Sequence, residues 1–243
     1  MQVLRVGGEH LAGRRQNARS ARLIIAGAGT VGAVALSVVL HPLVGVAFGI
    51  AVAPTAAMAH RSLHRIIKGI RGETAVAELL RSLPDDYFLF NDVALPGHPG
   101  NIDHVVVGPC GVLVIETKNF SGSGESHGNA WFVNGHRAGS VSKQANRGAI
   151  AVREALSRAH PDLEGSVLRD VDSIAVFTNP SSRVRVDRTK TIVARYSQLL
   201  DVILAIARRK RVPPRVAARL AETLSNLVSS GGLIVTEVPS RSL

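Results

Sequence analysis

The chain has 243 residues and a formal net charge of +11, and hydrophobic residues make up 46% of it. This balance is typical of a globular chain with an anionic partner, either nucleic acid or a membrane surface, or with an arginine-rich solvated surface. The single cysteine, Cys110, excludes an internal disulfide framework and a thiolate zinc site, and 4% aromatic residues argue against a surface built on base-stacking rings.

An uncharged segment dominates the N-terminal quarter, because residues 23–59 contain no Asp, Glu, Lys or Arg. His41-Pro42 divides it into two apolar stretches, each near the ~20 residues that a helix needs to cross a bilayer. Basic flanks place both ends in the cytoplasm. We therefore expect a basic cytoplasmic N-terminus over 1–22, a two-helix transmembrane hairpin over 23–59 and a basic connector over 60–71. The alternative is a buried helical hairpin of a soluble protein.

From Gly72 onward the pattern is that of an α/β domain with a mixed sheet flanked by helices. Helical periodicity predicts helices at 73–83, 143–159, 197–209 and 214–228. Apolar or alternating runs predict strands at 87–93, 101–107, 112–119, 130–133, 136–138, 171–177, 191–194 and 233–238. Asn134-Gly135 predicts the tight turn of a hairpin. We divide this part into a core over 72–180 and a C-terminal extension of the same domain over 181–243.

Three charged residues stand in the two central apolar strands, which read NIDHVVVG and GVLVIETK. Side chains alternate between the faces of a strand, so Glu116 and Lys118 share one face. If 108–111 forms a four-residue hairpin loop, Asp103 faces Glu116 across the strands and Asn101 faces Lys118. His104 then points to the opposite face, so we interpret it as structural.

Two carboxylates directly opposite each other, with Cβ atoms ~5 Å apart, destabilise a sheet. A divalent cation between Asp103 and Glu116 would remove the repulsion, because hard cations bind carboxylate oxygens. The alternative is a surface ion pair in which Lys118 balances Glu116. Glu73 lies on the apolar side of its predicted helix, so it points toward the core or its edge, although a helix start also favours a glutamate there.

This combination resembles the nuclease-related domain (NERD) family of the PD-(D/E)XK restriction-endonuclease-like superfamily. The resemblance covers roughly 70–180, and Ile102 stands where the superfamily name has a proline. It implies a restriction-endonuclease-like fold. The matching segments are Gly72-Glu73, Phe90-Asn91-Asp92-Val93, Asn101-Ile102-Asp103-His104, Gly111 through Ile115, Glu116-Thr117-Lys118-Asn119-Phe120, Gly122, Trp131 and Gln144.

The resemblance implies a metal-dependent nuclease that hydrolyses phosphodiester bonds of nucleic acid, with DNA favoured. Asp103 and Glu116 would bind Mg²⁺ or Mn²⁺ with help from the Thr117 carbonyl. Lys118 would orient or activate the attacking water, or stabilise charge on the phosphate. The remaining residues would act around them: Glu73 as support for the metal site, and Gln144, Arg147 and Asn119 as nucleic-acid contacts.

Two other functions remain open, a non-catalytic nucleic-acid-binding module and a membrane-anchored scaffold whose basic charge serves lipid alone. The presence of all three residues Asp103, Glu116 and Lys118 favours the nuclease, because a site without catalytic function would not need to keep all of them. The basic run Arg208-Arg209-Lys210-Arg211 is consistent either with phosphate contacts or with a solvated helix end.

Overall fold

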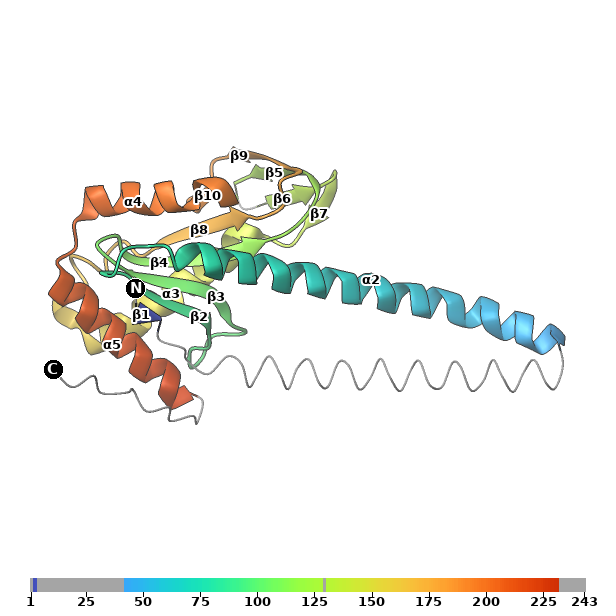
Figure 1. Ribbon diagram of the computed structural model, residues 1–243, viewed down its shortest axis with the longest axis horizontal. Coiled ribbons are helices and arrows are strands. Elements are labelled where there is room, and N and C mark those ends of the chain that lie inside the picture. Colours follow the sequence, from blue (N-terminus) through green and yellow to red (C-terminus); the bar gives the residue numbers. More distant parts are fainter. Residues whose placement is uncertain (1, 4–41, 129, 232–243) are drawn as a thin grey trace. The chain divides into compact units, whose positions relative to one another are not determined.

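The computed structural model describes residues 2–3, 42–128 and 130–231 (Figure 1). The first predicted membrane helix and the predicted strand at 233–238 lie outside these residues. The chain divides into two compact units, one of Glu9–Ile70 and one of Met1–Gly8 with Arg71–Leu243.

Helix α2 (Pro42–Leu80) is one continuous element of 39 residues. It contains the stretch predicted as the second membrane helix, and it continues through the predicted connector. The prediction that a helix begins at Glu73 is therefore wrong, because an isolated glycine such as Gly69 or Gly72 costs a helix only ~1 kcal/mol relative to alanine. No helix within the described part of the chain is both long and apolar enough to span a bilayer.

A six-stranded mixed sheet forms the centre of the second unit, in the order β1-β2-β3-β4-β8-β10 (Figure 1). Strands β2, β3 and β4 are antiparallel, whereas β8 and β10 run parallel to β4 and β1 runs parallel to β2. The predicted mixed sheet is confirmed. The bounds are β1 Gln2–Val3, β2 Phe88–Val93, β3 Ile102–Gly108, β4 Gly111–Lys118, β8 Asp172–Phe177 and β10 Ile192–Arg195.

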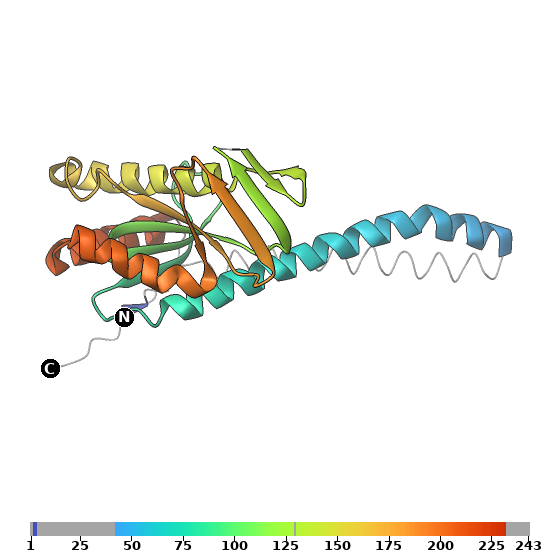
Figure 2. The same ribbon diagram turned by 90° about the horizontal axis from the view of Figure 1, so that it is seen from above.

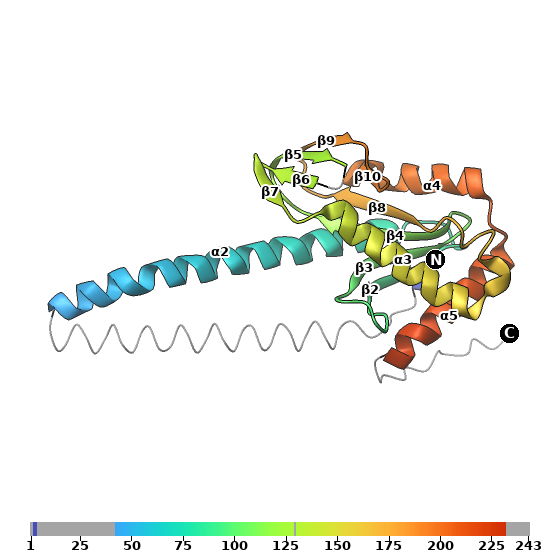
Figure 3. The same ribbon diagram turned by 180° about the vertical axis from the view of Figure 1, so that it is seen from behind.

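Helices cover both faces of this sheet, which explains why its central strands are almost continuously apolar. Helices α3 (Val141–Ala159) and α5 (Pro214–Gly231) pack on the face that carries Val105 and Val114. Helix α4 (Leu199–Lys210) and the end of α2 pack on the other face, against residues such as Leu113. Figure 2 shows α3 and α4 on opposite sides of the sheet, and Figure 3 shows α3 and α5 on the same side.

A second, four-stranded sheet was not expected from the sequence. Its order is β7-β6-β5-β9, with β5 Gly122–His127, β6 Ala130–Val133, β7 His136–Ala138 and β9 Ser182–Asp187. The β6–β7 hairpin is confirmed, and both turn residues have positive φ, 51° at Asn134 and 77° at Gly135. Neither β5 nor β9 was predicted. GSGESH has the composition of a loop, although the alternation in SRVRVD is typical of a strand.

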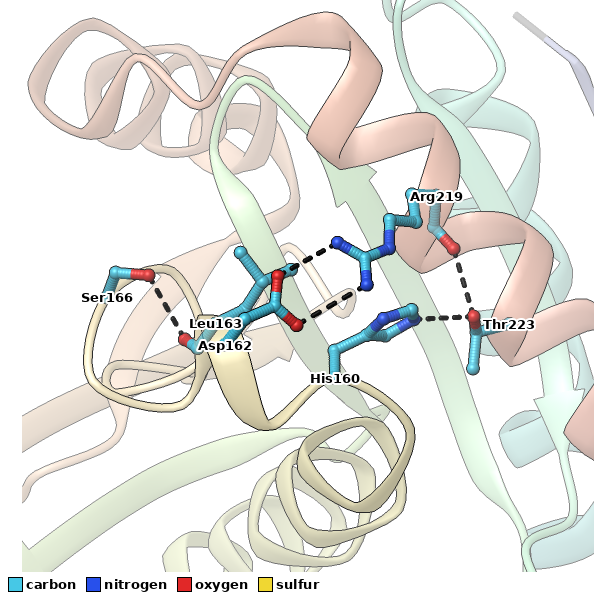
Figure 4. Close-up of polar contacts among 6 residues, drawn as sticks. All are labelled: His160, Asp162, Leu163, Ser166, Arg219 and Thr223. Atoms are coloured by element: carbon cyan, nitrogen blue, oxygen red, sulfur yellow. Dashed lines mark hydrogen bonds and ion pairs between the residues drawn. The ribbon is translucent and has the colours of Figure 1, made fainter.

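The end of α3 is tied to α5 by polar contacts that join the core to the C-terminal extension (Figure 4). Arg219 donates two hydrogen bonds to Asp162, at 2.9 and 3.4 Å, and the Thr223 hydroxyl donates to the carbonyl of Arg219 at 3.1 Å. Because that hydroxyl has one proton, it accepts from Nε2 of His160 at 2.6 Å. His160 is buried, so this contact fixes the packing of α5 more firmly than the exposed ion pair does.

Candidate active site

Strands β3 and β4 carry the charged residues in the register that loop counting predicted. Val105 pairs with Val114 and Val107 pairs with Val112. The turn itself is shorter than expected, because Gly108 also pairs with Gly111 and only two residues remain between them. Shortening the loop leaves the register unchanged, so Asp103 and Glu116 are the next opposed pair at the open end of the two strands.

Asp103 is anchored at this end by the backbone of β4. The amide of Thr117 donates to Oδ2 of Asp103 at 2.6 Å. Burial raises the pKa of Asp103, and the Thr117 amide and the charge of Lys118 offset part of that increase. The carboxylate is thus held in one orientation, with one oxygen bonded to the sheet.

Glu116 is almost completely buried, with 4% of its surface exposed. Burial and, next, the charge of Asp103 raise its pKa to about 7, although the ammonium of Lys118 acts in the opposite direction. Nζ of Lys118 donates to Oε1 of Glu116 at 2.5 Å and to Oε1 of Gln144 at 3.0 Å. Lys118 and Glu116 therefore do not form an ion pair on the surface, because the carboxylate that Lys118 binds lies in the protein interior.

Helix α3 brings Gln144 to this lysine. The helix begins after Ser140, whose hydroxyl accepts from the amide of Lys143 at 3.1 Å and caps the first turn. Arg147 lies one turn further along and is exposed. It forms no hydrogen bond or ion pair with either carboxylate in the described residues, and its Nε donates to the carbonyl of Lys143 at 3.4 Å. Gln144 is thus part of the cluster, whereas Arg147 lies at its margin.

Glu73 reaches the same end of the sheet from α2. Gly72, immediately before it, is buried, and a Cβ there would lie 3.1 Å from Cβ of Asn119 and 3.3 Å from a methyl of Thr117. Only glycine lets the helix backbone approach the end of β4 this closely. Glu73 itself remains at the surface, as the predicted edge position requires. Its pKa is raised to about 7, first by loss of hydration and then by the charge of Asp103.

Asp92 is a fourth carboxylate that the sequence reasoning missed. Asn91 pairs with His104 and Val93 pairs with Ile102, so Asp92 lies opposite Asp103. It has a left-handed backbone (φ 53°), and its Oδ1 accepts from Nδ2 of Asn101 at 2.5 Å. Asn101 precedes β3 and its side chain bonds to β2, so its opposition to Lys118 stays a prediction. Asp92 belongs to the segment 90–93 that resembles the family, but only the pairing of β2 with β3 brings it opposite Asp103.

His104 and Cys110 lie in the interior, as predicted for structural residues. His104 is 2% exposed, and its Nδ1 lies 2.7 Å from Oδ1 of Asn91. Burial lowers its pKa to about 4, so the ring is neutral at ordinary pH. Burial likewise raises the pKa of the Cys110 thiol to about 12, which makes it unreactive.

The donors at this end of the sheet suit a hard cation such as Mg²⁺. No group of three or more His, Cys, Asp or Glu side chains close enough to hold a metal occurs among the described residues. Mg²⁺, however, commonly uses one or two carboxylates and takes its other ligands from water and substrate phosphate. Asp103 and Glu116 with the Thr117 carbonyl could provide such an oxygen set. Burial, as the largest cause, raises the pKa of both carboxyl groups, and a bound cation would favour their ionised forms.

The basic run Arg208–Arg211 lies at the other end of the strands. Lys210 lies 3.5 Å from the position of a Cβ at Gly111 and forms an ion pair with Asp172 at 2.9 Å. Gly111 and Glu116 are five residues apart on β4, or about 17 Å. Phosphates bound by this run would therefore not be in contact with the carboxylates.

The comparison with protein families agrees with this geometry. Residues 68–178 match the family model described as Nuclease-related domain, NERD. No curated protein and no solved structure shows a significant match to the chain. The matched segment contains the carboxylates, Lys118 and Gln144, and its limits agree with those expected from the sequence. Residues 68–178 are therefore similar to the nuclease-related domain family.

Proposed function

We propose that the protein is a Mg²⁺- or Mn²⁺-dependent nuclease that hydrolyses phosphodiester bonds of DNA. The observation that carries this proposal is the position of Lys118. Its ammonium is held by a buried carboxylate, Glu116, and by Gln144, directly beside Asp103. A metal held by two carboxylates can activate a water, and the ammonium beside it can neutralise charge that develops on the phosphate.

Each residue has a specific task in this proposal. Asp103, Glu116 and the Thr117 carbonyl hold the metal, which when bound supplies Lewis-acid stabilisation of the phosphate and a more acidic water. Lys118 donates to the attacking water or to a phosphate oxygen that gains charge in the transition state. Gln144 fixes the direction of the ammonium, and Glu73 orders water around the metal ligands from the edge of the site.

The non-catalytic binding module is less well supported by the same contacts. A pure binding surface has no use for a carboxylate that is 4% exposed and has a pKa raised to about 7. An ionised carboxylate at such a buried position lowers the stability of the fold unless a cation binds it or a proton neutralises it. A membrane-anchored scaffold likewise gives no reason to keep a buried carboxylate at position 116 that lowers the stability of the fold.

Cleavage should disappear when Asp103 is replaced by asparagine. Full-length protein is incubated with labelled DNA and RNA in Mg²⁺, in Mn²⁺ and in chelator, and product is quantified on gels. We expect metal-dependent cleavage by the wild type and a loss of at least about 100-fold in Asp103→Asn, because second-sphere changes alone already cost 10–100-fold. An exposed acid on α4 gives the control, Asp201→Asn.

Metal-dependent cleavage that persists in Asp103→Asn would eliminate this site. Binding of nucleic acid by the wild type without cleavage under any metal condition would instead support the non-catalytic module. The DNA and RNA arms of the same experiment decide which substrate the enzyme prefers.

We further propose that residues 23–59 tether this nuclease to the cell membrane with the domain on the cytoplasmic side. Their lack of any Asp, Glu, Lys or Arg and the basic residues on both flanks support this. Wild-type protein should remain in the membrane fraction after washes in high salt and carbonate, and removal of residues 1–59 should release it. Wash-resistant membrane association of the truncated chain would refute the tether.

A further inference from the structure

The outer face of the second sheet carries three exposed arginines. Arg137 on β7 and Arg183 and Arg185 on β9 are exposed, and none of them forms an ion pair with another described residue. The inner face is different, because Trp131 is fully buried there beside Phe177. The sheet therefore has one face fixed to the domain and one face free for a partner.

Four side chains form a single row across this outer face. The strand register pairs Arg137 with Phe132, Phe132 with Glu125, and Glu125 with Arg185. With strands about 4.8 Å apart, the two arginines at the ends of the row are about 14 Å from each other. The row offers positive charge at both ends, and Glu125 is the single acid within it.

An aromatic pair lies between the arginines. The rings of His127 and Phe132 are 6.1 Å apart in an edge-to-face arrangement, with His127 exposed and Phe132 half-buried. The low aromatic content of the chain argued against a surface built on such rings, but one ring pair suffices to stack a base. Exposed arginines around an aromatic ring are a combination that proteins use to bind single-stranded nucleic acid.

The chain connections put this sheet next to the candidate active site. Strand β4 ends at Lys118 and β5 begins at Gly122, while β8 ends at Phe177 and β9 begins at Ser182 (Figure 1). Both links leave the main sheet at the end that carries Glu116 and Lys118. Two strands of the second sheet thus follow directly from β4 and its neighbour β8 in the main sheet.

We propose that this outer face binds a single strand of nucleic acid through its phosphates and leads it to the carboxylate site. The proposal rests on the proposed nuclease function for the identity of the ligand. The surface suits a strand better than anionic lipid, because the exposed row contains one half-buried apolar side chain and so offers little to insert into a membrane.

The test removes two charges from β9 and measures binding in chelator, where no cleavage occurs. The full-length variant Arg183→Ala/Arg185→Ala is titrated against a fluorescein-labelled oligothymidylate by anisotropy at several salt concentrations. We expect a Kd about tenfold higher than that of the wild type. The slope of the logarithm of the binding constant against the logarithm of the salt concentration should become smaller in magnitude by about 1.4, or ~0.7 for each phosphate that the variant no longer neutralises. Thermal unfolding verifies that the variant is folded.

A matched double variant, Arg208→Ala/Arg215→Ala, removes two exposed charges at the other end of the strands and should leave both values near the wild type. The proposal is overturned if the two double variants weaken binding equally, or if a duplex of the same length binds as tightly as the single strand. It is also overturned if anionic vesicles, and not the oligonucleotide, depend on Arg183 and Arg185. Arginine-dependent binding by a protein that never cleaves would uphold the surface while removing the proposed nuclease, and cleavage with arginine-independent binding would do the reverse.

Discussion

Replacing Lys118 by methionine is expected to lower kcat for metal-dependent cleavage by about 10²–10³-fold, the cost of removing one charged donor from a preorganised site. Methionine keeps most of the aliphatic length, so the packing at the end of β4 changes little. The group removed is the ammonium that donates to Glu116 and Gln144. Because it acts on charge that develops during the reaction, affinity for nucleic acid in chelator should remain near the wild-type value.

The control for this experiment is Lys143→Met, one residue before Gln144 and exposed on the same helix. It removes the same charge from nearly the same place without touching the carboxylates, and it should leave kcat unchanged. Single-turnover rates and anisotropy separate the chemical step from binding. A Lys118→Met enzyme that cleaves as fast as Lys143→Met would show that the lysine only balances Glu116.

Glu116→Gln is expected to remove a pH-dependent loss of stability from the metal-free protein. Burial and the charge of Asp103 raise the folded-state pKa of Glu116 from 4.5 to about 7. The folded state therefore binds this proton more tightly than the unfolded chain does. The stabilisation is complete below pH 4.5 and is lost as the pH rises through about 7.

Between pH 5 and pH 8 the wild type should lose about 2 kcal/mol more unfolding free energy than Glu116→Gln, because one pKa unit corresponds to ~1.4 kcal/mol and the neighbouring charges share the effect. Urea unfolding at the two pH values measures the difference. Glu222→Gln, an exposed acid on α5, should behave as the wild type does. If the unfolding free energies of the wild type and Glu116→Gln depend equally on pH, then ionisation of Glu116 does not destabilise the folded state.

Mg²⁺ provides a second measurement on the same pair of proteins. At pH 8 a cation bound between the carboxylates should raise the unfolding free energy of the wild type by ~2.7 kcal/mol at a concentration of 100 Kd. The same addition should do little to Glu116→Gln, whose amide carries no charge. At pH 5 the effect should shrink for the wild type as well, because protons compete for the ligands.

The sequence alone was sufficient to predict strands β3 and β4 and the opposition of Asp103 and Glu116. Two apolar runs joined by a short glycine-flanked turn allow few registers, and a slip by one residue would turn every valine to the wrong face. The same alternation put Lys118 beside Glu116. These are local properties of a hairpin, which is why counting residues was enough to find them, together with the tight turn at Asn134-Gly135.

Tertiary structure alone decided which distant residues join that hairpin. Asp92 is aligned with Asp103 by the pairing of β2 with β3 and by its left-handed backbone, which no periodicity predicts. Glu73 reaches the site because Gly72 lets a long helix lie against β4, although the sequence suggested that the helix began there. The second sheet gathers Arg137, Arg183 and Arg185 from segments far apart in the chain. Local alternation determines a face, but only long-range packing and strand pairing determine what lies beside it.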